Sequence, residues 1–231
     1  MPTVVITGAN RGLGLEFATQ YAAEGWRTLA CCRQPERAPD LMQLAQGSHG
    51  RLTVHPLEVT NPDHVNAFRD SLGTSGIDVL INNAGIYGQK GVSFGNSDAD
   101  IWKHTFHTNV IAPFQIMEKL RDNLAAGERR VVANVTSKMG SIADNGSGGS
   151  YIYRSSKSAL NSAMRSAALD LGGDGFKVVL LHPGWVQTDM GGDNALIDAQ
   201  TSVSRMRGII EGLSAQDNGR FIDQDGSTIP W

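Results

Sequence analysis

The sequence predicts an α/β fold, with a doubly wound parallel sheet of about seven strands, helices on both faces and a single domain spanning residues 1–231. Three observations lead to this prediction. Short apolar runs alternate with helical patterns along the chain, an order that produces parallel sheets with right-handed crossovers. Several runs are continuously apolar, as strands covered on both faces are. Glycine-rich segments follow three of the runs.

Taken in order, six apolar runs are predicted to be strands. They are TVVIT (3–7), RTLACC (27–32), RLTVHPL (51–57), DVLINN (78–83), RVVANVT (130–136) and KVVLLHP (177–183). Helical patterns lie near 12–24, 37–46, 62–74, 99–125 and 151–171. The glycine-rich segments 85–95, 140–149 and 184–192 each follow a strand. We therefore expect them at the carboxyl edge of the sheet, where such folds bind ligands.

Composition and charge exclude several classes of protein. An apolar content of 40% and a charged content of 19% indicate a soluble globular chain. The net charge of −3 gives no support to nucleic acid or an anionic membrane as a partner. No apolar run approaches the ~20 residues of a membrane span, and no signal peptide is visible. The adjacent Cys31 and Cys32 exclude a disulfide scaffold and fit a reducing compartment, so a cytoplasmic location is predicted.

The first strand runs into a glycine turn, with Gly8, Gly12 and Gly14 ahead of the first helix. Glycines there let the backbone approach a pyrophosphate, which the helix N-terminus attracts. The spacing is G-x-x-x-G-x-G rather than the standard G-x-G-x-x-G. A glycine turn is a weak signal by itself, but its place after the first strand indicates a Rossmann-type dinucleotide site.

The end of the second strand indicates which dinucleotide is bound. An NAD site usually has an acid about 20 residues beyond the glycines, where it bonds the ribose 2′-hydroxyl. Here Arg33 stands in that place, and Arg11 lies within the glycine turn. Two guanidinium groups suit a 2′-phosphate, so NADP(H) is predicted in preference to NAD(H). The alternative is that both arginines are solvated surface charges.

Six motifs in order carry a family resemblance. They are TGANRGLG (7–14), NNAG (82–85), Asn109 in TNVIAPF, Ser137 in NVTSKMG, Tyr153-x-x-x-Lys157 and HPGWVQTDM (182–190). Together they resemble the short-chain dehydrogenase/reductase family over nearly the whole chain. Segments such as MGSIADN and GRFIDQDGSTIPW are similar to its small carbonyl reductases, the group that includes sniffer and C-factor proteins.

This resemblance implies a catalytic tetrad of Asn109, Ser137, Tyr153 and Lys157. Tyr153 and Lys157 share one helical face, and an ammonium there should lower the pKa of the phenol. Ser137 would donate to the substrate carbonyl oxygen as negative charge develops. Asn109 is expected to hold a water that links Lys157 to solvent.

Position and resemblance also imply contacts with the cofactor. The residues are Gly8, Asn10, Arg11, Gly12, Leu13, Gly14, Arg33, Glu58, Val59, Asn82, Asn83, Ala84, Gly85, Tyr153, Lys157, Pro183, Gly184, Val186 and Thr188. Glu58 stands where the family usually has Asp, which puts its expected contact with the adenine amine in doubt. No metal site is predicted, because the six histidines lack a credible set of further ligands.

The expected activity is NADPH-dependent reduction of an aldehyde, ketone or quinone to an alcohol, with Tyr153 as the proton donor. The expected partner is a small carbonyl or alcohol molecule, and the chain is expected to form a homodimer or homotetramer. Two alternatives stay open at this point. One is a catalytically weak, NADP(H)-binding regulatory protein of C-factor type. The other is a sugar-nucleotide epimerase or dehydratase, which usually needs an added substrate domain.

Overall fold

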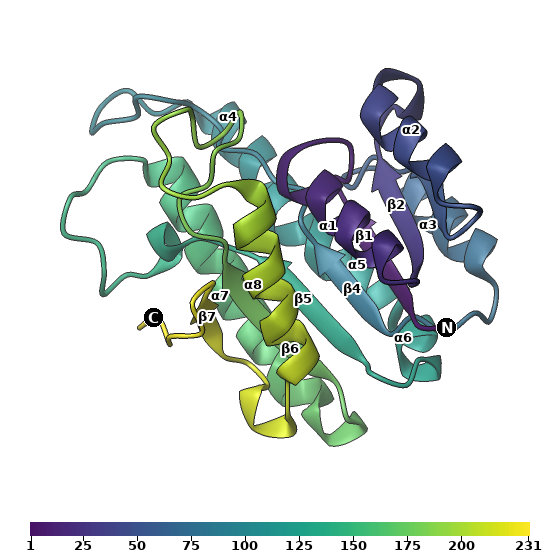
Figure 1. Cartoon of the computed structure of the whole chain (residues 1–231). Helices are drawn as coiled ribbons and strands as arrows, with labels where there is room; N and C mark the ends of the chain where they lie inside the picture. Colours follow the sequence, from purple (N-terminus) through teal and green to yellow (C-terminus); the bar gives the residue numbers. More distant parts are fainter.

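A seven-stranded, all-parallel sheet forms the centre of the molecule (Figure 1). The computed structural model describes residues 1–231. The strands are β1 (Thr3–Thr7), β2 (Arg27–Cys32), β3 (Leu52–Pro56), β4 (Val79–Asn82), β5 (Val131–Val135), β6 (Lys177–His182) and β7 (Phe221–Asp223). Their order is β3-β2-β1-β4-β5-β6-β7, so the direction of winding reverses between β1 and β4. The predicted doubly wound fold is confirmed.

Helices cover both faces of this sheet (Figure 1). The α-helices are α1 (Gly12–Ala23), α2 (Pro39–Gly47), α3 (Pro62–Leu72), α4 (Ala99–Phe106), α5 (Ala112–Lys119), α6 (Arg121–Ala126), α7 (Tyr151–Leu171) and α8 (Ala199–Gly212). Shorter turns are the 3-10 helices η1 (Pro35–Arg37), η3 (Lys138–Gly140), η4 (Gly172–Asp174) and η5 (Ala215–Asp217), and the π-helix η2 (His107–Ile111). None of the helices combines the length and apolar character needed to cross a bilayer.

Alternating side chains on the strands build one core on each face of the sheet. In β1, Val4 and Ile6 pack with residues of α1, α2 and α8. Val5, between them, packs instead with residues of α3, α5 and α7. Cys31 and Cys32 are buried in β2 and divide between the two cores in the same way. The continuously apolar runs are therefore explained by burial on both sides.

The predicted helix over 99–125 is divided into α4, η2, α5 and α6. Pro113 explains the first interruption, because it has no N–H to donate to the carbonyl four residues earlier. The chain widens there into a π-turn, in which the Ala112 N–H bonds the His107 carbonyl. Asn109 lies inside this turn, and such turns are frequent at functional sites.

Two elements lie outside the predicted ones. Helix α8 begins after Asp198, whose carboxylate accepts from the Thr201 N–H at its N-terminus. It buries Val203, Met206 and Ile210 against α1 and the sheet. Strand β7 has only three residues and extends the sheet beyond β6. The segment after Thr188 thus leads into a full helix of the core.

Candidate active site

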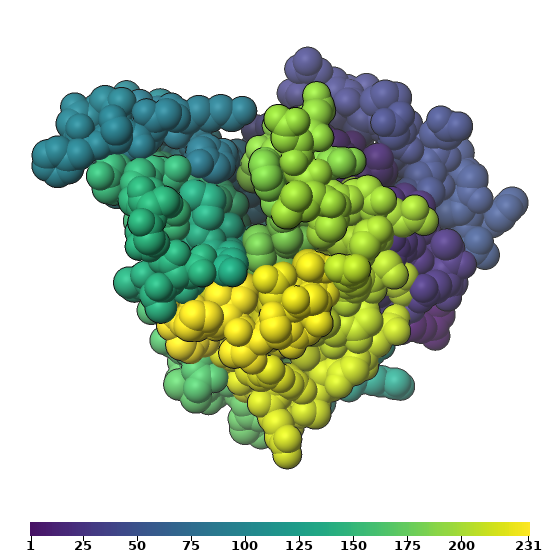
Figure 2. All heavy atoms as spheres, turned by 60° about the vertical axis from the view of Figure 1, so that its left-hand side comes forward, coloured from purple at the N-terminus to yellow at the C-terminus, as the bar shows by residue number.

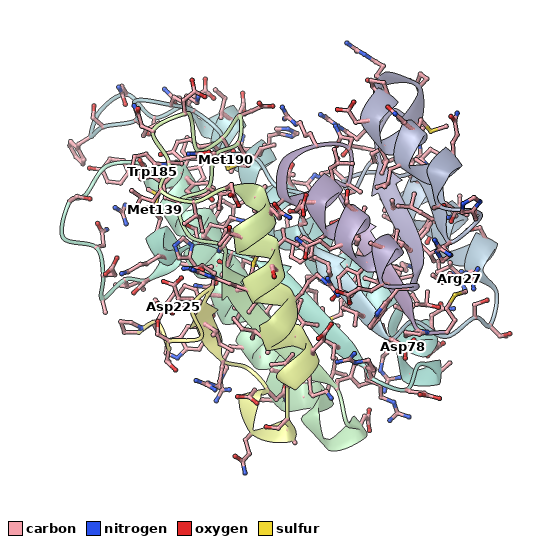
Figure 3. All side chains as sticks on the ribbon, viewed as in Figure 1. Arg27, Asp78, Met139, Trp185, Met190 and Asp225 are labelled. Atoms are coloured by element: carbon pink, nitrogen blue, oxygen red, sulfur yellow. The ribbon has the colours of Figure 1, made fainter.

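Three loops gather at the carboxyl edge of the sheet, after β4 (83–98), β5 (136–150) and β6 (183–198). The predicted position of the glycine-rich segments is confirmed. Figure 3 shows Met139, Trp185 and Met190 on this side of the molecule, while Arg27 and Asp78 mark the opposite edge. Figure 2 shows the loop near residue 190 standing beside the loop near residue 90.

The glycine turn is fitted closely against the sheet. A Cβ on Gly14 would lie 2.1 Å from the Gly8 carbonyl oxygen, and a Cβ on Gly8 would lie 2.9 Å from Ala84 Cα. Gly8 also has a positive φ of 66°, which favours glycine. No side chain caps the N-terminus of α1, which leaves its first N–H groups available to an anion. Asn10, Gly12 and Leu13 are partly exposed at this turn.

The NNAG segment ties the glycine turn to β4. The Asn83 amide donates to the carbonyls of Thr7 at 2.9 Å and Gly8 at 3.1 Å. Thr7 Oγ1 in turn accepts from the N–H groups of Asn83 and Ala84. The Asn83 side chain therefore fixes the shape of the turn, and this use of it was absent from the sequence prediction.

Asn82 faces the protein interior. Its side chain donates to Asn134 Oδ1 at 2.9 Å and to the Pro113 carbonyl at 3.3 Å, and the residue is only 4% exposed. Asn82 and Asn134 are paired residues on β4 and β5, so the two amides bridge neighbouring strands under α5. The side-chain amide is therefore used inside the fold, and the expected contact of Asn82 with the cofactor stays a prediction.

Both predicted phosphate-binding arginines are paired with acids. Arg11 forms an ion pair with Asp189, and the two side chains are 70% and 76% exposed. Arg33 Nε lies 3.6 Å from Glu58 Oε2. Glu58 also accepts from the Thr60 hydroxyl at 3.1 Å. The Glu58 carboxylate is thus already paired within the protein. Val59, the next residue, is partly exposed.

The loop after β6 reaches over the glycine turn. Thr188 lies so close to α1 that a Cβ on Gly12 would be 3.4 Å from its Cγ2. Gly184 has a φ of 84°, and the Pro183 carbonyl accepts from Ser202 Oγ of α8 at 2.6 Å. The backbone of Val186 pairs with Ile197 across the loop. Helix α8 therefore anchors the start of this loop.

Three of the four predicted catalytic residues converge at the start of α7. Tyr153 and Lys157 lie on its first turns, and Ser137 follows β5. The Lys157 ammonium donates to the Val135 carbonyl at 3.0 Å and lies 5.8 Å from the centre of the Tyr153 ring. Tyr153 and Lys157 are 8% and 6% exposed. A Cβ on Gly140 would lie 2.9 Å from Lys157, so the turn after Ser137 packs closely on α7.

Asn109 contacts this group from η2. Its Oδ1 accepts from the Ile86 N–H at 2.9 Å, and its Nδ2 donates to the Ile86 carbonyl at 2.8 Å and Ser156 Oγ at 3.0 Å. A Cβ on Gly85 would lie 3.3 Å from Asn109 Oδ1 and 3.6 Å from Lys157 Nζ. Gly85 therefore separates the two residues, and all four side chains of the tetrad surround one small region.

Burial dominates the electrostatics of this region. It raises the pKa of Tyr153 to about 12, opposed by the neighbouring Ser137 hydroxyl, and it lowers the pKa of Lys157 to about 8. The expectation that Lys157 lowers the pKa of Tyr153 is wrong for the chain by itself. The reason is that burial of the phenol dominates its pKa, while the Lys157 ammonium donates to the Val135 carbonyl.

Two contacts of the site are absent from the sequence prediction. The ring of Tyr87 stacks on Tyr153, with centroids 4.6 Å apart. The carbonyl of Trp231 accepts from the N–H groups of Ile142 and Ala143 and from Ser141 Oγ. Figure 2 shows this end of the chain lying against the loop after β5. Only the aromatic character of Tyr87 and Trp231 could have suggested them.

No group of three or more His, Cys, Asp or Glu side chains is arranged to hold a metal ion. His182 is largely buried at the end of β6, which lowers its pKa despite the nearby Asp223 carboxylate. The absence of a metal requirement stays a prediction.

Comparisons with known proteins agree with this geometry. A family model described as short chain dehydrogenase matches residues 2–196. The C-signal protein of Myxococcus xanthus is 46% identical over 167 residues, covering 72% of this chain and all of that protein. The carbonyl reductase Sniffer of D. melanogaster has a TM-score of 0.94 at 32% identity, with both chains fully covered. An NADPH-bound carbonyl reductase from chicken fatty liver has a TM-score of 0.93 at 34% identity, covering 100% of this chain and 99% of that one.

Proposed function

The chain belongs to the short-chain dehydrogenase/reductase family of oxidoreductases, and from that premise we propose that it reduces a small carbonyl compound with NADPH. The observation that carries the proposal is the meeting of Ser137, Tyr153 and Lys157 beside the switch in strand order between β1 and β4. Ligands of doubly wound folds bind at such a switch. A protein that only holds a dinucleotide has no need of a phenol and an ammonium buried together there.

The residues present fit a dinucleotide. Gly8 and Gly14 let the glycine turn pack directly against itself and against the NNAG segment, and no side chain caps the N-terminus of α1. In this proposal α1 and Thr188 hold the pyrophosphate, while Arg11 and Arg33 hold the 2′-phosphate of NADP(H). When bound, the nicotinamide would supply the hydride.

The chain's own groups manage the proton and the developing charge. Tyr153 is protonated at neutral pH, as a phenol ordinarily is, and burial raises its pKa further; it can donate its proton to a carbonyl oxygen. The Ser137 hydroxyl lies beside it and can donate to the same oxygen, lowering the energy of the alkoxide as it forms. Lys157 is the nearest cation, and its lowered pKa of about 8 lets it pass a proton to Tyr153 near neutral pH.

The walls available to a substrate are largely apolar. Met139, Ile142, Trp185 and Met190 lie on the loops after β5 and β6, and Phe94 lies on the loop after β4. Ile142, Phe94 and Trp185 are half or more exposed. Such walls favour an aldehyde, ketone or quinone over a charged sugar phosphate.

The proposal is tested by screening aldehydes, ketones and quinones for oxidation of NADPH, with NADH in parallel. Tyr153→Phe should lower kcat by about 100-fold or more while the affinity for NADPH changes less than about threefold, because only the proton donor is lost. Activity of the Tyr153→Phe variant at the wild-type rate would contradict the assignment.

A second candidate is a regulatory protein that binds NADP(H) without rapid turnover. The 46% identity to the C-signal protein favours it. The two candidates differ in the same screen, since a regulator would bind NADPH in a fluorescence titration and reduce no carbonyl in the panel.

We also propose that α7 joins two or four copies of the chain, which light scattering would measure.

A further inference from the structure

Tyr87, which belongs to none of the six motifs, packs directly against Tyr153, the proposed proton donor. It lies two residues beyond the NNAG segment, on the loop after β4. Its ring and that of Tyr153 are stacked, with centroids 4.6 Å apart and planes at 20°. Stacked aromatic pairs attract each other beyond the area they bury. Tyr87 thus covers one face of the ring whose hydroxyl is expected to donate the proton.

The backbone on both sides of Tyr87 is fixed. Asn109 bonds both the N–H and the carbonyl of Ile86, at 2.9 and 2.8 Å. Gly88 has a φ of 77°, and a Cβ there would lie 2.6 Å from Thr105 Oγ1. No other residue type fits at position 88 without a shift. Tyr87 is therefore held between two rigid contacts with the helices behind it.

The hydroxyl of Tyr87 is fixed as well. It shares a 2.9 Å hydrogen bond with Ser150 Oγ, at the residue that precedes α7. Ser150 has a φ of 47°, a left-handed conformation that costs free energy in a residue other than glycine. Its N–H donates to the Val92 carbonyl at 3.2 Å. The strained residue Ser150 therefore lies at the point where the loop after β4 is bonded to the start of α7, the helix that carries Tyr153.

The titratable groups that face Tyr153 are Tyr87, from the loop, and Lys157, from its own helix. The Lys157 ammonium lies 5.8 Å from the centre of the Tyr153 ring. Burial, and to a smaller extent Tyr87, disfavours the phenolate and raises the pKa of Tyr153. The Ser137 hydroxyl is hydrogen-bonded to Tyr153 and opposes this rise in pKa.

We propose that Tyr87 is a positioning residue, which holds the Tyr153 ring in one orientation and shields it from water during proton transfer. The inference rests on the proposed function. Its physical basis is that proton transfer needs a donor within hydrogen-bond reach, and a misplacement of 1 Å can cost about 100-fold in rate. Asn109, through Ile86, and Ser150 support Tyr87 from either end.

The test compares graded variants of Tyr87. Tyr87→Leu and Tyr87→Met remove the stack, and kcat for the best carbonyl of the screen should fall about 10- to 100-fold, with the KM for NADPH within about twofold. Tyr87→Phe keeps the stack and loses only the bond to Ser150, so its kcat should fall about threefold. Ser150→Ala should have the same effect, and the double variant should add nothing, because both changes remove one bond. Tyr151→Leu serves as the control, since that tyrosine precedes the site and its hydroxyl makes no hydrogen bond.

A second measurement does not depend on turnover. In protein labelled at the tyrosine ring carbons, NMR follows ionisation of the four tyrosines, each assigned by its Phe variant. The wild-type Tyr153 signal should show no titration up to pH values near its raised pKa of about 12 or the limit of the folded state. In Tyr87→Leu and Tyr87→Met the same signal should begin to titrate at lower pH, as water reaches the ring.

Earlier titration of Tyr153 together with the loss of kcat supports the inference. A fall in kcat with an unchanged Tyr153 titration would overturn it, because Tyr87 would then be a substrate contact. Earlier titration with unchanged kcat would overturn it too, because shielding would have no effect on the reaction. If the wild-type protein reduced no carbonyl, the proposed function would fail, and the titration by itself would decide whether Tyr87 shields Tyr153.

Discussion

Lys157 is a cation held almost wholly out of water, with one carbonyl as its only hydrogen-bond partner. Burial lowers its pKa from an ordinary value of 10.5 to about 8. Below about pH 8 the folded and unfolded chains both carry the charge, and the folded chain bears the full cost of desolvation. As the pH rises toward 10.5, the unfolded chain alone keeps the proton, so this cost disappears.

Lys157→Met should therefore stabilise the protein at pH 7 by about 2 kcal/mol, net of the lost hydrogen bond, while abolishing carbonyl reduction. Chemical denaturation measures the free energy of unfolding. The gain should shrink between pH 8 and pH 10.5, where the wild-type lysine loses its charge. Lys103→Met, at a side chain 77% exposed, is the control and should change little at any pH. A gain that stays constant with pH would contradict this account.

Arg33 and Glu58 are expected to influence how strongly the protein prefers NADPH, which carries the 2′-phosphate, to NADH. Arg33→Asp should lower the ratio of kcat/KM for NADPH to that for NADH by about 10-fold or more, because a charged hydrogen bond to phosphate is replaced by repulsion. Glu58→Gln removes a competing acid, and the KM for NADPH should fall about twofold. Arg37→Asp makes the same charge change on an exposed arginine nearby. If Arg37→Asp had the same effect as Arg33→Asp, the change would be a general effect of charge and would contradict a direct contact between Arg33 and the 2′-phosphate.

At the scale of residues, the sequence identifies side chains better than it identifies their partners. The order of the motifs was enough to predict that Ser137, Tyr153 and Lys157 meet. The pairing of Arg11 with Asp189, 178 residues away, depends on how two loops cross and has no local signal. The same holds for Tyr87 beside Tyr153. The direction of the Tyr153 pKa was missed because burial, unlike charge, cannot be counted along a sequence.

At the scale of elements, the close packing of the glycine turn predicts the effect of adding a methyl group at Gly14. A Cβ on Gly14 would lie 2.1 Å from the Gly8 carbonyl oxygen, so Gly14→Ala must displace α1 from β1. The affinity for NADPH should fall about 10-fold or more, because in the proposed function this turn holds the pyrophosphate. Fluorescence titration measures this loss, and a thermal melt should show a lower Tm.

Gly208→Ala is the matched control. Gly208 lies on the exposed side of α8, and a Cβ there has nothing within 4 Å. Alanine should stabilise this helix by about 0.5–1 kcal/mol and leave NADPH affinity unchanged. Loss of affinity in Gly208→Ala, or none in Gly14→Ala, would show that close approach at the turn is not what binds the cofactor.

Elements with strong periodicity were predicted, and those with mixed composition were not. The six predicted strands have boundaries within one residue of those observed. Helix α8 was missed because Ser202 and Arg207 interrupt its buried, otherwise apolar face. The acid at Asp198 and the spacing of Val203, Met206 and Ile210 were the signals that could have found it. The π-turn in the 99–125 segment arises from Pro113, whose effect on register is hard to place in advance.

At the scale of the whole molecule, Trp231 joins the last strand to the substrate side of the site. Its ring stacks on Phe221 of β7, with centroids 5.7 Å apart. Trp231→Ala should loosen residues 141–143, raising the KM for the carbonyl substrate about three- to tenfold while the KM for NADPH is unchanged. Trp231→Phe keeps a ring on Phe221 and should behave nearly as wild type. Steady-state kinetics would contradict the prediction if the two variants were equal.

The anchor at Trp231 also has a consequence for synthesis on the ribosome. A nascent chain that has reached residue 182 already contains the glycine turn and all four residues of the proposed tetrad. It still lacks the carbonyl that accepts from Ser141, Ile142 and Ala143. The loop beside Ser137 therefore gains its fixed shape only when translation has passed the final tryptophan. A chain that is made only in part therefore lacks the contacts that fix the loop beside Ser137.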